Sequence, residues 1–151
     1  MLIRKLALVS LALPGLLASI NGSAHHSYAM FDGSQVRTIV GTIAKLEWTN
    51  PHVFLWVYVS NPASDTGYDL YALENGSPNV LRVRGWSPTF FKEGELVAIR
   101  YWPVIDGQTG GHFAVLTRAD GTVVYGAGGP GGSPDAGKAI APPPAPKASE
   151  Q

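Results

Sequence analysis

The stretch "SQVRTIVGTIAKLEWTNPHVFLWVYVS", residues 34–60, carries the strongest strand signals in the chain. Gly41 interrupts its first half, where a long strand can bulge or bend. "TNP" at residues 49–51 turns the chain, and residues 52–60 predict a second strand that is apolar on both faces. Alternation in the first strand assigns Thr38, Val40, Thr42, Ala44, Leu46 and Trp48 to one face and Arg37, Ile39, Ile43, Lys45 and Glu47 to the other.

The residues beyond this stretch complete a recognisable order of elements. "YDLYALE" predicts a third strand, and Ser77-Pro78 starts a short helix that Gly85 can end. Two more strands follow, in residues 95–104 and 111–126, the latter with a hairpin at Asp120-Gly121. Three strands, a helix and two strands are the order of the OB-fold. We therefore expect an all-β, OB-fold-like five-stranded barrel with one short helix over residues 34–125.

The two ends of the chain have different compositions. Arg4 and Lys5, an apolar run over residues 6–17 and a small polar segment have the order of a secretory signal peptide. Gly22 and Ala24 fill the small positions of a cleavage site, so we predict a signal peptide over residues 1–24; an uncleaved anchor is the alternative. Residues 25–33 form an N-terminal segment, and residues 126–151, rich in Gly, Pro and Ala, predict a disordered tail. The expected location is the periplasm or the exterior.

Charge and cysteine content exclude several functions. The chain has 11 Lys and Arg against 11 Asp and Glu, so loss of Arg4 and Lys5 leaves a net charge of about −2. This balance argues against a nucleic-acid partner. No cysteine is present, which excludes disulfides, thiol chemistry and Cys-ligated zinc.

Several motifs together resemble one family. They are "AHHSYAMFD", "GTIAKLEWTNPHVFLWV", "ENGSPNVLRVRGW", "FKEGELVAI" and "ADGTVVYGAG". In this combination the chain resembles a group of small exported proteins, mainly proteobacterial, that are classed as a domain of unknown function. The resemblance implies a secreted small β domain and supplies no catalytic residues.

An adjacent histidine pair, His25 and His26, follows the predicted cleavage site. A cut after Ala24 would give His25 a free α-amine, and its amine and imidazole nitrogens could chelate one Cu(II). A cut after Ser23 would instead leave an Ala-His-His terminus, which makes a square-planar Cu(II) or Ni(II) site. Both cuts predict affinity for copper, but only the first leaves a coordination position on the metal open.

A third ligand would have to come from the barrel. His52, in "TNPH" at the start of the second strand, is the first candidate, and His112 in "GGHF" is a weaker one. The structural alternative is a solvated His25-His26 tail, with His52 satisfying backbone groups at the Asn50-Pro51 turn. The predicted metal site therefore consists of His25, His26 and His52.

An aromatic surface is the second candidate site. Phe54, Trp56 and Tyr58 share one side of the second strand, and the aliphatic residues between them fit the barrel interior better. With Trp86, these residues predict a patch that could stack a sugar ring or dock an envelope protein. The alternative is that the N-terminal segment or the helix covers the patch.

Catalytic motifs are missing from the sequence. It has no Gly-x-Ser-x-Gly elbow and no phosphate-binding loop, and its acidic residues are spread singly. We therefore expect a binding protein and no enzyme, with copper as the one expected cofactor or cargo.

Overall fold

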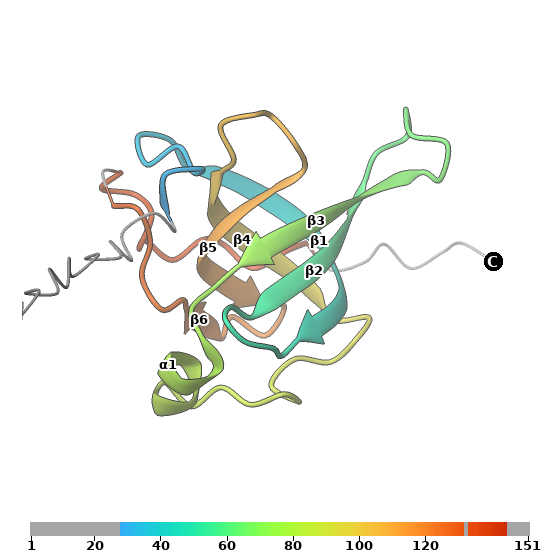
Figure 1. Cartoon of the computed structure of the whole chain (residues 1–151). Helices are drawn as coiled ribbons and strands as arrows, with labels where there is room; N and C mark the ends of the chain where they lie inside the picture. Colours follow the sequence, from blue (N-terminus) through green and yellow to red (C-terminus); the bar gives the residue numbers. More distant parts are fainter. Residues whose placement is uncertain (1–27, 132, 145–151) are drawn as a thin grey trace, which may run out of the picture.

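The computed structural model describes residues 28–131 and 133–144 (Figure 1). None of the helices in these residues has the length and apolar character needed to cross a membrane. The elements, in chain order, are β1 (Arg37–Glu47), β2 (Phe54–Ser60), β3 (Tyr68–Glu74), α1 (Pro78–Val83), β4 (Leu96–Pro103), β5 (Gly110–Arg118) and β6 (Val123–Tyr125).

The strands close into a barrel. Neighbours follow the order β3-β2-β1-β4-β5, and a parallel pairing of β3 with β5 closes the ring, while β6 is added at β5. The short helix α1 lies between β3 and β4 in the chain and sits at the lower end of the barrel in Figure 1. This connectivity is that of the OB-fold, so the predicted fold class is confirmed.

Strand β1 is long, and it pairs with two different strands along its length. It pairs with β4 over Arg37–Thr42 and with β2 over Thr42–Glu47. The register shifts between Ile43 and Lys45, two to four residues beyond Gly41, and this shift marks a β-bulge. Gly41 directly precedes Thr42, the residue that belongs to both pairings.

The bulge overturns the predicted alternation of β1. Strict alternation assigned Ile43 and Leu46 to opposite faces, but Ile43 is buried in the core and Leu46 packs against the same core. An extra residue at a bulge exchanges the two faces of the strand downstream of it. Ile39 on one side of the bulge and Trp48 on the other therefore face the same interior.

Strand β2 follows its predicted alternation. Val53, Leu55 and Val57 are buried in the interior, whereas Phe54 and Trp56 are only partly buried and Tyr58 is exposed. The aliphatic side of β2 thus fills the barrel and the aromatic side faces outward, as expected.

Helix α1 begins as the sequence indicates. Ser77 is its N-cap and accepts a hydrogen bond from the backbone N–H of Val80, and Pro78 occupies the first turn. Leu81 is fully buried, so the helix adds to the core at the end of the barrel.

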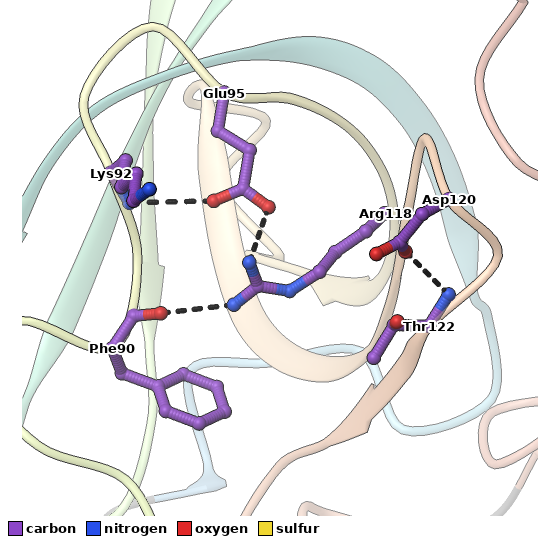
Figure 2. Close-up of polar contacts among 6 residues, drawn as sticks. All are labelled: Phe90, Lys92, Glu95, Arg118, Asp120 and Thr122. Atoms are coloured by element: carbon purple, nitrogen blue, oxygen red, sulfur yellow. Dashed lines mark hydrogen bonds and ion pairs between the residues drawn. The ribbon is translucent and has the colours of Figure 1, made fainter.

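A polar connection ties the loop before β4 to the end of β5 (Figure 2). Arg118 Nη1 lies 2.7 Å from Glu95 Oε1, and its other terminal nitrogen donates to the carbonyl of Phe90 at 2.9 Å. The backbone N–H of Lys92 donates to the second Glu95 oxygen at 3.3 Å. Because these contacts cross-link two distant chain segments, we interpret them as structural.

Segments from both chain ends lie on the outside of the barrel. Phe31 forms an isolated antiparallel bridge with Val104, and a small outer cluster joins Phe31, Trp102 of β4, Ala114 of β5 and Ala136. Parts of the N-terminal and C-terminal segments therefore pack against the same apolar cluster.

The predicted disordered tail makes defined contacts over part of its length. Arg100 donates to the backbone carbonyls of Asp135 and Lys138 at 2.6 and 2.9 Å. A Cβ atom on Gly129 would lie 2.1 Å from the Trp102 ring, so glycine allows the chain to approach that ring. Composition alone missed these contacts because small residues permit close packing on a large aromatic; residues 145–151 lie outside the described residues.

Candidate functional site

His52 lies two residues before β2, where backbone hydrogen bonds with the residues just after β3 fix the chain. The N–H of Val53 donates to Gly76 at 3.1 Å, and the N–H of Asn75 donates to Val53 at 2.8 Å. His52 Nδ1 lies 2.6 Å from Glu74 Oε1. A carboxylate accepts the proton of Nδ1, which leaves Nε2 as the ring nitrogen available to a metal or another donor.

Glu74 is the last residue of β3 and is unusually enclosed for a carboxylate. Its side chain is 13% exposed and lines a cavity of about 150 Å³ together with Met30, Phe31 and Phe54. Burial raises the pKa of Glu74, and the attraction of His52 opposes that rise. An enclosed carboxylate with a raised pKa that holds a histidine makes this place a candidate functional site.

His112 lies on the adjacent strand, because its Cα pairs with that of Glu74 across the β3–β5 junction. It is 2% exposed, and its Nδ1 lies 3.1 Å from the carbonyl of Phe113. Since a carbonyl only accepts, Nδ1 carries the proton in this contact. Burial, with a smaller contribution from the nearby charge of His52, lowers the pKa of His112 to about 4, although the hydrogen bond with the Phe113 carbonyl opposes this shift.

The N-terminal segment covers His112. The rings of Tyr28 and Phe31 meet the imidazole edge-on, with centroid distances of 5.0 and 5.4 Å. Trp102 closes another side at 5.8 Å. His112 therefore anchors the N-terminal segment beside the strand that carries Glu74.

The predicted ligands His25 and His26 lie outside the described residues. They precede Tyr28 by three and two residues, and an extended chain covers at most about 3.6 Å per residue. From the position of Tyr28, His26 can thus reach about 7 Å and His25 about 11 Å. Within the described part of the chain, no group of three or more His, Cys, Asp or Glu side chains could hold a metal ion. The barrel alone therefore offers an oriented histidine without a full set of ligands.

Three of the four aromatic candidates lie on the outer face of β2, namely Phe54, Trp56 and Tyr58. Trp56 donates its indole N–H to Glu47 at 3.1 Å, and Lys45 lies over its ring. Tyr58 is 41% exposed and meets Tyr68 edge-on at 4.7 Å. The outward placement of Phe54, Trp56 and Tyr58 follows the expectation from the sequence.

Trp86 does not belong to this surface, and its predicted place in the patch is wrong. It is 4% exposed and packs in the core against Phe90, Phe91 and Phe113. Trp86 follows α1 directly and packs in the same core cluster as Leu81 of that helix.

Sequence reasoning missed three residues that shape these sites. Glu74 is an acidic residue at the end of a strand, on the face that also carries Tyr68, Leu70 and Ala72, which could have indicated a special role there. Tyr68 continues the period-two face of β3 opposite β2, so it could have been assigned to the aromatic face. Nothing in the sequence indicated that Tyr28 would pack on His112.

The fold and these contacts define a class of protein, namely a small OB-fold-like barrel with an oriented histidine–carboxylate pair beside its N-terminal segment. Within that class, the chain belongs to the family of unknown function DUF6152, whose model matches residues 15–113. The match covers the N-terminal segment and the barrel as far as Phe113 in β5. Comparison with curated proteins and with solved structures finds no match.

Proposed function

We propose that this protein is an exported copper-binding protein, in which His25 and His26 of the N-terminal segment act together with His52 of the barrel. It binds the ion and does not turn over a substrate. The location, in the periplasm or outside the cell, is part of the proposal and follows from the predicted signal peptide.

One observation carries the proposal. Tyr28, two residues after the histidine pair, packs on His112, whose strand neighbour Glu74 holds His52. The chain that bears the pair is therefore attached to the barrel end where His52 is oriented. Imidazole and amine nitrogens are ligands that Cu(II) prefers, and copper leads the divalent affinity order.

The role of Glu74 in this proposal is to orient His52. A metal-bound histidine commonly donates its other ring N–H to a carboxylate, which fixes the ring and its tautomer. The 2.6 Å contact of His52 Nδ1 with Glu74 has that arrangement.

Native mass spectrometry of the protein after export with its own N-terminal sequence tests this function. We expect a mass that begins at His25 and one Cu(II) retained against a competing chelator. His52→Ala, and separately the pair His25→Ala with His26→Ala, should release the copper while circular dichroism stays unchanged. Retention that is indifferent to His52 would contradict the proposal, because an amine-plus-imidazole terminus binds some copper by itself.

A second candidate is a binding face for an envelope glycan or protein, formed by Phe54, Trp56 and Tyr58 of β2. What favours it is the exposure of Tyr58 and of its neighbour Tyr68, at 41% and 42%, on the strands where OB-folds bind oligosaccharides. Calorimetry with soluble envelope oligosaccharides tests it. Tyr58→Ala should abolish heat of binding without unfolding the protein, and an absence of binding by the wild type would reject the glycan form of this candidate.

A further inference from the structure

The cavity that Glu74 lines is the feature of this end of the barrel that the proposed function leaves unused. Its volume is about 150 Å³, and an apolar protein cavity of about that size can hold a benzene molecule. Its lining comes from the N-terminal segment, from β2, β3 and β5, and from the loop between β4 and β5. It is therefore large enough for a small organic ligand.

The cavity lies at the junction that closes the barrel. Gly110 and Gly111 of β5 line it, and Gly110 pairs with Ala72 of β3. A Cβ atom on Gly110 would lie 2.6 Å from the carbonyl oxygen of Ala72, so the strands would have to separate to admit a side chain there. The pairing of two strands thus fixes the position of the cavity.

The charged groups that line the cavity are all acidic. They are Glu74 and Asp106, and none of the described residues that line the cavity is Lys, Arg or His. Glu74 is the enclosed one, with its side chain 13% exposed, whereas Asp106 is exposed. Glu74 contacts His52 through Oε1, and a carboxylate has a second oxygen that can accept a hydrogen bond from a ligand. A cation therefore complements the charge of this cavity.

Aromatic side chains supply the apolar part of the lining. Phe31 is 5% exposed, and Phe54 is the cross-strand partner of Glu74 on β2. Aromatic rings attract cations and pack against alkyl chains. A metal ion would use the carboxylates alone, and the described part of the chain brings together no group of three or more His, Cys, Asp or Glu that could hold one. The lining thus favours a cation that carries an alkyl chain.

We propose that this cavity binds a small primary alkylammonium ion, with the ammonium group at Glu74 and the alkyl chain against Phe31 and Phe54. An ammonium donates to a carboxylate in a charge-assisted hydrogen bond, which is stronger than one between neutral groups. The site does not include His52 and requires no metal. This inference goes beyond the proposed function and does not depend on it.

A nuclear magnetic resonance titration of the full exported chain, with a metal chelator in the buffer, tests the proposal. The probes are n-butylammonium, n-butanol and butyrate, which combine a similar chain with a positive, a neutral and a negative head group. We expect n-butylammonium to shift the amide signals of Gly110 and Gly111 saturably, n-butanol to bind at least about tenfold more weakly, and butyrate not to bind. Equal affinities for n-butylammonium and n-butanol, or no saturable shift at the two glycines, would overturn the proposal.

A pair of variants locates the ammonium group. Glu74→Gln keeps the size of the side chain and removes its charge, so it should weaken binding of n-butylammonium about tenfold or more. Asp65→Asn is the matched control, because Asp65 is an exposed acid in the loop between β2 and β3 that does not line the cavity, and it should leave the affinity unchanged. Unchanged affinity in a folded Glu74→Gln protein would also overturn the proposal. If circular dichroism shows that this variant is unfolded, the comparison of the three probes in the wild type decides.

Discussion

His112 shows at the scale of one residue how burial and contact fix a side chain. Its ring is enclosed by Tyr28, Phe31 and Trp102, and Nδ1 donates to a backbone carbonyl. Such a ring packs as a neutral aromatic, and protonation would place an uncompensated charge in an apolar site.

This burial predicts a pH dependence of stability. The pKa of His112 is about 4 in the folded protein, below its ordinary value of 6.5, so the unfolded chain binds more protons between these values. The contribution of His112 is therefore complete above pH 6.5 and is lost as the pH falls toward 4, on the order of 3 kcal/mol in total. Urea unfolding of wild type and His112→Gln at pH 7 and pH 4 measures it. The variant should lose less stability than the wild type, and equal losses would show that His112 does not titrate in this way.

Gly41 is a second single residue on which the fold depends. A Cβ atom there would lie 2.4 Å from the carbonyl oxygen of Tyr58, so β1 and β2 must separate to admit one. Gly41→Ala should lower the free energy of unfolding by about 2–3 kcal/mol. Gly137→Ala, where a Cβ atom meets nothing within 4 Å, is the control and should change it little. Similar thermal unfolding of both variants would contradict the crowding at Gly41.

Between elements, the contact of Arg118 with Glu95 and Phe90 joins β5 to the loop before β4. Both charged side chains are mostly buried, so removal of one leaves the other without its partner. Arg118→Met should lower the free energy of unfolding by about 2 kcal/mol. Lys138→Met, which breaks the exposed pair with Asp135, should change it by less than about 0.5 kcal/mol. Equal denaturation midpoints for the two variants would refute the cross-link.

The pairing of β2, β3 and β5 brings His52 and Glu74 together, so the role of Glu74 is also tested at this scale. Glu74→Gln keeps the size of the side chain but removes the carboxylate that orients His52, and we expect about tenfold weaker Cu(II) binding. Glu47→Gln, an acid on the outer face of β1, is the matched control. Chelator competition measures both. Unchanged affinity in Glu74→Gln would mean that His52 needs no carboxylate to bind the metal.

For the whole molecule, sequence reasoning recovered the barrel because local signals agree with one another. The period-two pattern of β2, the Ser77-Pro78 helix start and the Asp120-Gly121 hairpin each encode an element within a few residues. The faces of β1 beyond Ile43 could not be predicted, since a bulge depends on the partner strand and leaves no fixed signature.

The candidate site was only partly predictable, because its residues also come together only through the pairing of strands. His52 stood out as a histidine at a turn, but its partner Glu74 is 22 residues away and becomes its neighbour only through β2–β3 pairing. Trp86 was assigned to the surface because nothing local encodes its packing in the core cluster. Long-range contacts, which assemble sites, are those that a single sequence encodes least directly.

In the proposed function, one copper ion is shared by the N-terminal segment and the barrel. Pulsed electron paramagnetic resonance of the exported protein with one equivalent of Cu(II) tests it most directly, because coordinated imidazole rings modulate the echo. We expect His52→Ala to lower the number of coordinated imidazoles by one, with the fold intact by circular dichroism. Identical spectra for wild type and His52→Ala would contradict it, because the N-terminal histidines would then bind copper without the barrel.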